Sequence, residues 1–198
     1  DHVSGLIRGV NQRIGALKRL TYHLPQKYLP QITQAIIVSK LRYGISIYCP
    51  VRTSDQEPVS GLVRDLQVTL NKAMRVAVGC RLRDRVSISD LCAQTKVQSI
   101  NRMSATDKLM LIWRAKNEPM SPLLSSVPER KEDTRNPTSR ATTRGDIPIY
   151  STSSLGQRNF PTPCIRLWNK TEPMLRRAIN LRVAKQKVGL FVKALPLL

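Results

Sequence analysis

The sequence predicts a mainly α-helical fold, and three observations carry that prediction. Apolar residues recur at steps of three and four over several stretches, which is the spacing of one helical face. They make up 41% of the 198 residues, enough for a buried core. Most prolines fall between these stretches. We expect a helical domain over residues 1–116, a linker or extended loop over 117–158 and a small helical subdomain over 159–198.

The N-terminal domain is predicted to contain three longer helices. The first covers residues 3–17, with its apolar face at Val3, Leu6, Val10, Ile14 and Leu17. The second covers residues 28–43 and is apolar around much of its circumference. Its end, residues 43–48, also fits a short strand, because apolar and polar residues alternate there. The third covers residues 62–77 and is expected to end at Gly79.

Shorter elements follow the third helix. Residues 81–85 are predicted to form a turn with three arginines, and Ser87 with Asp90 is a typical helix start. Another helix is expected to begin near Ser99 and to include Trp113. Residues 118–158 are rich in Pro, Ser, Thr and Arg and lose the apolar periodicity, which predicts a long loop.

The C-terminal subdomain is expected to hold two helices. Thr162 and Pro163 together form a helix start with proline at the first helical position. Asn180 is expected to cap the final helix, which carries apolar residues from Leu181 to Leu195.

The charge of the chain indicates a polyanionic partner. Thirty-three Lys and Arg face thirteen Asp and Glu, for a net charge of +20 and a pI of about 10.7. Nucleic acid is the first candidate and an anionic membrane surface the second. No apolar run is long enough to span a bilayer. We expect nucleic acid, and no membrane, as the partner. Residues 117–158 carry six basic and five acidic residues, so the excess lies on the predicted helices.

Two groups of basic residues are the candidate nucleic-acid contacts. They lie off the apolar faces of their helices or in turns, where guanidinium groups can donate forked hydrogen bonds to phosphates. The first group, on the third helix and in the turn after it, is Arg64, Lys72, Arg75, Arg81, Arg83 and Arg85. The second group, near the C-terminus, is Arg176, Arg177, Arg182, Lys185 and Lys187.

No catalytic constellation is present in the sequence. Two-metal nucleotidyl transfer requires clustered carboxylates, but no two of the eight Asp residues are adjacent. Phosphate-binding loop, HExxH and GxSxG motifs are absent. The four cysteines have no metal-ligand spacing, so we expect no metal or other cofactor in this chain. Such scattered thiols, with no signal segment, suit a reducing compartment, the nucleus or the cytoplasm. Since the chain starts at Asp1, we expect a fragment or a processed product.

The order of several motifs resembles the region that follows the catalytic palm in reverse transcriptases of non-LTR (LINE-type) retrotransposons. These motifs are the aromatic-glycine step in residues 41–48 and the form LQ-x-x-x-N-K-A-x-R from Leu66 to Arg75. Phe160, the element Arg166-Leu167-Trp168-Asn169, Pro173 and Leu175-Arg176 follow far downstream. The sequence departs from the family pattern at residues 170–172, which add one residue before Pro173.

The resemblance implies a thumb-like helical bundle that clamps a template–primer duplex, without the palm that polymerises. Its partners would be RNA or an RNA/DNA hybrid, and the palm domain of the same polymerase. Catalytic Mg²⁺ would belong to that absent palm. Two other interpretations stay open: a helical module that docks on an acidic protein or polymerase core, and an inactive retroelement remnant. The oligomeric state is not predicted.

Five residues are expected to have structural roles. Asn71 lies near the apolar face of its helix, and we favour an amide that bonds a neighbouring loop. Trp113 and Trp168 lie at apolar helical spacing, which favours the core over base stacking. Phe160 and Asn169 belong to the motifs of the resemblance, where we assign them structural roles.

Overall fold

The structure is a computed structural model that describes residues 2–81, 83–117, 147, 162–171, 175, 178 and 180–197. The predicted mainly α-helical class is confirmed, and the described residues include no strand. The chain divides into two compact units. Unit 1 comprises residues 1–104 and 195–198, and unit 2 comprises residues 105–194. The predicted loop over 117–158 lies outside the described residues apart from Asn117 and Ile147, so the predicted three-part division stays a prediction.

Unit 1 is built around two long helices. Its elements in order are α1 (His2–Leu20), the 3₁₀ turn η1 (Gln26–Tyr28), α2 (Leu29–Thr33), the π-helical turn η2 (Gln34–Val38), α3 (Ser39–Arg42), α4 (Ile45–Tyr48), α5 (Gly61–Val78), α6 (Ile88–Thr95) and the first turns of α7 (Ile100–Asn117). The strand alternative for residues 43–48 is wrong. Gly44 adopts a left-handed conformation with φ 70°, which ends α3 and starts the helical turn α4.

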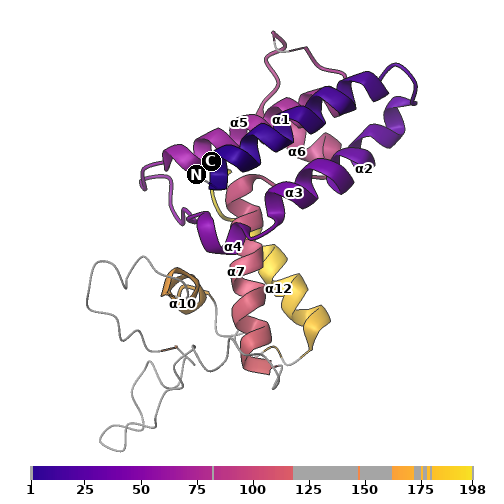
Figure 1. The fold of residues 1–198 in the computed structure, drawn as a ribbon. Coiled ribbons are helices and arrows are strands. Elements are labelled where there is room, and N and C mark those ends of the chain that lie inside the picture. Colours follow the sequence, from indigo (N-terminus) through magenta and orange to yellow (C-terminus); the bar gives the residue numbers. More distant parts are fainter. Residues whose placement is uncertain are drawn as a thin grey trace, which may run out of the picture. The chain divides into compact units, whose positions relative to one another are not determined.

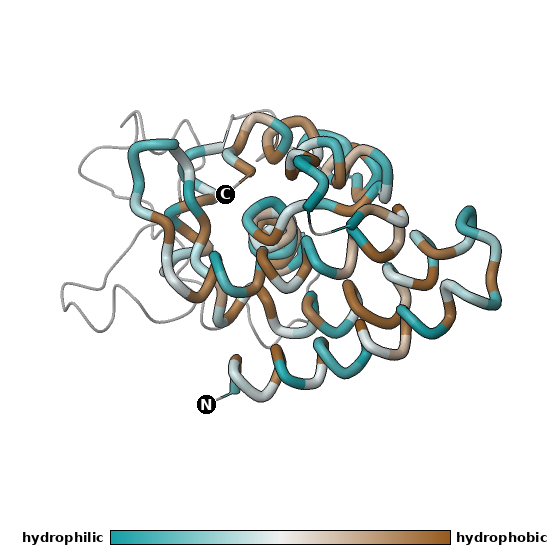
Figure 2. The backbone as a smooth tube through the Cα atoms, turned by 90° about the horizontal axis from the view of Figure 1, so that it is seen from above, coloured by the Kyte–Doolittle hydropathy of each residue, from teal (hydrophilic) through white to brown (hydrophobic). Residues whose placement is uncertain are grey.

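The core of unit 1 lies between the apolar faces of α1 and α5, which pack against each other (Figure 1). Leu6, Val10, Ile14 and Leu17 of α1 are buried. Leu66, Leu70 and Met74 are among the buried residues that α5 adds to the same cluster. Hydrophobic and hydrophilic positions alternate along the helices, as expected for amphipathic segments (Figure 2). Each large aliphatic side chain buried here contributes about 1.5–3 kcal/mol relative to exposure.

Two side chains of unit 1, one guanidinium and one amide, donate hydrogen bonds to backbone carbonyls. The π-helical turn η2 interrupts the regular bonding between α2 and α3, and Arg13 Nη1 donates to the Ile36 carbonyl at 2.7 Å. Gln34 Nε2 donates to the Thr95 carbonyl at 3.1 Å, at the C-terminal end of α6. These bonds connect elements far apart in sequence and fix η2 against α1 and α6.

The predicted helix limits at Gly79, Ser87 and Asn180 are confirmed. Gly79 follows α5 in a left-handed conformation, with φ 76°. A Cβ atom there would lie 3.0 Å from Gln26 Nε2, so both conformation and space favour glycine. The Ser87 side chain accepts from the Asp90 N–H, and the Asn180 side chain accepts from the Arg182 N–H.

One buried amide connects three segments of unit 1. The side chain of Asn101, in the first turn of α7, accepts from the Arg52 N–H at 2.8 Å and donates to the Arg52 carbonyl at 3.1 Å. Asn101 Nδ2 also donates to the Pro196 carbonyl at 2.9 Å. The neighbouring Arg102 Nη2 donates to the Leu195 carbonyl at 3.0 Å. The segment between α4 and α5 and the last residues of the chain are thereby fixed to the start of α7.

Unit 2 contains the rest of α7 from Ala105 onward, α10 (Thr162–Asn169) and α12 (Leu181–Lys193). The sequence analysis places Trp113 and Trp168 in the core, and both side chains are buried in the structure. Trp113 Nε1 donates to the Ala178 carbonyl. Lys116 Nζ lies 5.5 Å from the centre of the Trp168 ring. Stacking of either indole on a base would require exposing it.

The Asn169 side chain bonds the backbone of Ile147, which is the one residue that the structure describes between 118 and 161. Its Oδ1 accepts from the Ile147 N–H at 2.9 Å, and its Nδ2 donates to the Ile147 carbonyl at 2.8 Å. The side chain of Ile147 is buried. Asn169 therefore has the structural role expected of it, whereas Phe160 lies outside the described residues.

Candidate nucleic-acid interface

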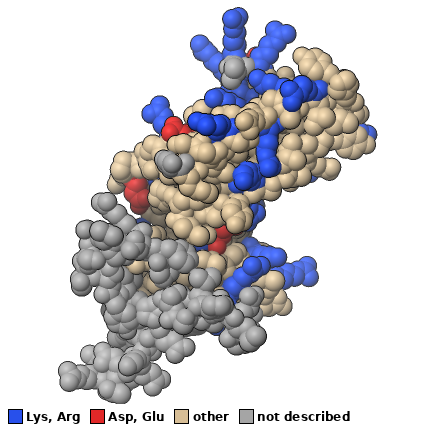
Figure 3. All heavy atoms as spheres, viewed as in Figure 1, with Lys and Arg blue, Asp and Glu red and all other residues tan. Residues whose placement is uncertain are grey.

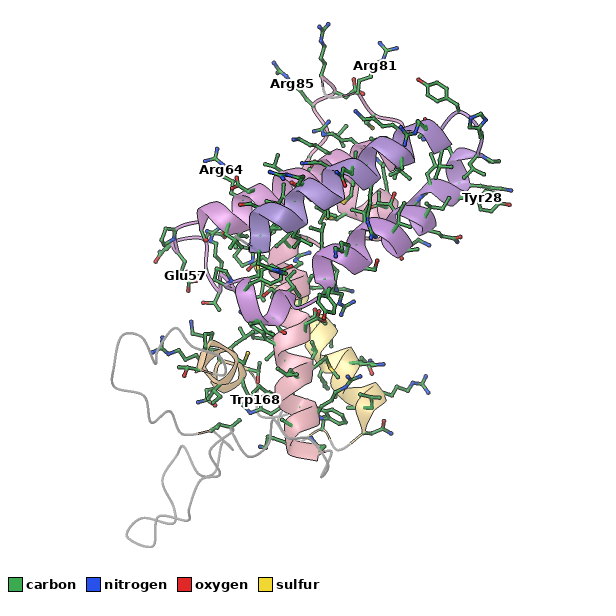
Figure 4. All side chains as sticks on the ribbon, in the orientation of Figure 1. Tyr28, Glu57, Arg64, Arg81, Arg85 and Trp168 are labelled. Atoms are coloured by element: carbon green, nitrogen blue, oxygen red, sulfur yellow. The ribbon has the colours of Figure 1, made fainter. Side chains whose placement is uncertain are left out.

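The solvent-exposed face of α5 carries basic residues. Val68 and the predicted contacts Arg64 and Lys72 are exposed and follow one another at steps of four residues, which places them on one face. Arg64 points outward from the helix (Figure 4). The Cα atoms of Arg64 and Lys72 are separated by about 12 Å along the helix axis, from a rise of about 1.5 Å per residue. That span equals between three and four base steps at about 3.4 Å each.

The segment after α5 carries three further arginines. We name residues 80–86, between α5 and α6, the arginine loop. Asp84 Oδ2 accepts from the Arg81 N–H at 2.6 Å, and the Asp84 N–H donates to the Arg81 carbonyl at 3.1 Å. The loop carboxylate is thus bonded to the backbone at the start of the turn. Arg81, Arg83 and Arg85 are exposed.

Arginine side chains project from this loop into solvent. Arg81 and Arg85 extend away from the helices in divergent directions (Figure 4). In the space-filling view, Lys and Arg protrude at this end of unit 1, and Asp and Glu are sparse on the visible face (Figure 3). Several guanidinium groups on a short turn can bond to successive phosphates of one backbone.

Arg75 has a different role from its neighbours. Its Nη1 donates to the carbonyls of Arg81 at 3.3 Å and Asp84 at 2.8 Å, and its Nη2 donates to the carbonyl of Val86 at 3.1 Å. The sequence predicts Arg75 as a phosphate contact. Because three N–H groups of its guanidinium are bonded to the backbone of the arginine loop, we do not count it among the contacts proposed below. Arg75 fixes the shape of the loop that carries the exposed arginines.

The substitution Arg75→Gln should loosen the arginine loop. It removes three hydrogen bonds from a charged donor, and we expect a loss of about 1–2 kcal/mol of stability, since part of each bond is exposed to solvent. Trypsin should cleave the variant after Arg81, Arg83 and Arg85 several-fold faster than the wild type, as measured by mass spectrometry of the fragments. Arg64→Gln removes the same charge from the same helix and should leave the cleavage rate unchanged. Equal cleavage rates in both variants would contradict the role of Arg75.

Asn71 acts through a second amide on the same helix. Gln67 is buried, and its Nε2 donates to Asn71 Oδ1 at 2.8 Å. Gln67 Oε1 accepts from the Ile100 N–H at 2.8 Å, at the first residue of α7. The two amides of the LQ-x-x-x-N motif therefore satisfy an open donor at the start of α7. Asn71 orients Gln67 and does not itself bond a neighbouring loop.

The second predicted basic group lies in unit 2. Arg182 and Lys185 are exposed on α12, while Lys187 is half-buried beside a hollow of about 260 Å³ lined by Leu175, Leu190, Phe191 and Ala194. Arg176 and Arg177 lie outside the described residues. Arg182 and Lys185 are three residues apart and so share a face.

The four cysteines form no disulfide with one another. All four cysteines are free, with Cys49 and Cys164 buried. Burial raises the pKa of the Cys164 thiol to about 11, although the nearby positive charge of Lys108 acts in the opposite direction. Within the described part of the chain, no group of three or more His, Cys, Asp or Glu is placed to hold a metal ion. None of the helices described there has the length and apolar character needed to cross a membrane.

Comparison of the chain with protein-family models, with curated proteins and with solved structures finds no match.

Several residues that fix segments of unit 1 to one another carry weak sequence signals. Gln67 was detectable, because an amide lies within the apolar pattern of a helix whose neighbouring positions are buried. Gln26 and Asn101 were not, because each bonds a segment more than forty residues away. Arg75 resembles the other basic residues of its helix in sequence, and only the path of the loop distinguishes it.

Proposed function

We propose that this chain binds RNA or an RNA/DNA hybrid through the phosphate backbone, without catalysing a reaction itself. The contacts are Arg81, Arg83 and Arg85 of the arginine loop, with Arg64 and Lys72 along α5. Binding through phosphates positions a duplex without reading its bases, so one affinity should apply to all sequences. The setting is the nucleus or the cytoplasm.

The single observation that carries the proposal is the arginine loop with its support. The Arg75 guanidinium donates to three carbonyls of the loop, and the Asp84 carboxylate accepts from the Arg81 N–H. A loop held in this way presents Arg81, Arg83 and Arg85 to solvent with little left to order on binding, which favours affinity for a polyanion. The net charge of +20 agrees with such a partner, and so does the resemblance to the region after a reverse transcriptase palm.

The experiment is a titration of the wild-type chain with a 16-base-pair RNA/DNA hybrid over a range of salt concentrations. Five phosphate contacts, each contributing about 0.9 to the salt dependence as in duplex DNA, predict a slope of log K against log salt of about −4 to −5. Two hybrids of unrelated sequence should give the same affinity. No binding at about 0.05 M salt, or a slope near zero, would contradict the proposal.

A protein partner with an acidic surface is the rival for the same residues. An acidic peptide of equal charge, titrated under the same conditions, separates the two. Nucleic acid should bind more tightly, because guanidinium groups on a phosphate backbone gain forked hydrogen bonds along a regular array of charges. Tighter binding of the peptide than of the hybrid would favour the protein-interaction function.

A further inference from the structure

A second exposed segment of unit 1 is fixed to the base of the arginine loop. Residues 18–28, which we name the basic turn, comprise the last residues of α1 and its connection to α2, including η1. Gln26 Nε2 donates to the Val78 carbonyl, the last residue of α5, and the Gln26 side chain packs against Gly79. Only Cys80 separates Gly79 from Arg81. The basic turn is therefore bonded to the end of α5, two residues before the arginine loop begins.

The basic turn is itself well ordered. Thr21 Oγ1 donates to the Lys18 carbonyl at 2.7 Å, and the N–H groups of His23 and Leu24 both donate to the Leu20 carbonyl at 3.0 Å. These bonds satisfy carbonyls at the C-terminal end of α1. The side chain of Tyr22 thus extends from a turn whose backbone is fixed, and it requires little ordering to receive a ligand.

Tyr22 is the more exposed of the two tyrosines in this turn. Its exposed fraction is 87%, and the exposed residues Lys18 and Arg19 lie four and three positions before it in the sequence. Tyr28 is less suited, because its exposed fraction is 45% and Lys27 Nζ lies 4.9 Å from the centre of its ring. Proteins bind unpaired nucleotides by combining base stacking on an exposed aromatic ring with phosphate contacts from basic side chains, and this turn offers both residue types.

We infer that Tyr22 is a stacking platform for an unpaired base, and that Lys18 and Arg19 contact the phosphates beside it. This inference rests on the proposed function and narrows its ligand. The preferred partner is a hybrid with a single-stranded overhang, whose paired part lies on the arginine loop and whose unpaired nucleotide lies on the basic turn. Because every base has a π face, stacking there needs no particular sequence.

The test compares three variants on two ligands by fluorescence anisotropy: a blunt hybrid and the same hybrid with a four-nucleotide overhang. Tyr22→Leu removes the ring, and Tyr22→Phe keeps it. Tyr43→Leu is the matched control, because Tyr43 is 76% exposed and immediately precedes Gly44 and α4, at the opposite end of unit 1 from the arginine loop (Figure 1).

The wild type should bind the overhang ligand more tightly than the blunt one. Tyr22→Leu should lower affinity for the overhang ligand about 10-fold, from a stacking contribution of about 1–3 kcal/mol per base, and leave the blunt ligand unchanged. Tyr22→Phe and Tyr43→Leu should match the wild type on both ligands. Equal affinity of wild type and Tyr22→Leu for the overhang ligand, with the blunt hybrid still bound, overturns this inference alone. Failure of the wild type to bind either ligand overturns the proposed function, and this inference with it.

Discussion

Replacing Arg81, Arg83 and Arg85 together by Gln should lower the affinity for an RNA/DNA hybrid about 1000-fold at ~0.1 M salt, since each lost phosphate contact costs roughly 1.4 kcal/mol, or tenfold. The salt dependence should fall as well, with the slope of log K against log salt decreasing in magnitude by about 2.7. Because the lost contacts are to phosphates, hybrids of different sequence should lose the same factor. Fluorescence anisotropy over a salt series measures both quantities.

A control variant removes equal charge elsewhere in unit 1. Arg8, Lys40 and Lys96 are exposed and lie outside the arginine loop and the basic turn. Their replacement by Gln should lower the affinity by less than tenfold through the general field, with little change in slope. If the two triple variants lose affinity equally, net charge and not the arginine loop determines binding.

Replacing Asn101 by Ala should destabilise unit 1 by about 3 kcal/mol, a large loss for a polar side chain. The Asn101 side chain has an exposed fraction of 0% and makes three hydrogen bonds. Alanine leaves the Arg52 N–H and the carbonyls of Arg52 and Pro196 without these partners, and a buried unpaired group costs about 1–3 kcal/mol. Urea unfolding followed by circular dichroism measures the loss.

Asn11 gives the matched comparison. It lies exposed in α1, so Asn11→Ala deletes the same amide group from a solvent-exposed position. The free energy of unfolding should change by less than about 0.5 kcal/mol, and any change should be an increase, because Ala has the higher helix propensity. A loss in Asn101→Ala no larger than in Asn11→Ala would show that the bonds to Arg52 and Pro196 do not hold unit 1 together.

The helices of unit 1 could be predicted from local pattern, because their apolar faces repeat with the helical period. The faces of α1 and α5 bury most of the residues that the spacing selects, with Val3 of α1 only half-buried. Gly79 and Ser87 end and start helices where their chemistry predicts. Residues 43–48 could not be settled in the same way, because six residues fit both periods. Their helical form depends on the left-handed conformation of Gly44.

The candidate site was predictable as a set of charges but not as a geometry. The sequence places Arg75 and Arg81 together as basic residues, whereas the structure bonds one to the backbone of the other. The fold of the loop determines which guanidinium groups bond the backbone and which extend into solvent. The local composition does not carry that information. The same holds for Gln26, whose bond to Val78 joins two segments separated by more than fifty residues.

The most direct test of the arginine loop follows the arginine side chains themselves. In a nitrogen-15 NMR titration of the chain with the RNA/DNA hybrid, the Nε–Hε resonances of Arg81, Arg83 and Arg85 should shift as phosphates bind. The resonance of Arg75 should stay in place, because its guanidinium remains bonded to the carbonyls of Arg81, Asp84 and Val86. Shifts confined to arginines outside the loop, or to Arg75 alone, would contradict the account.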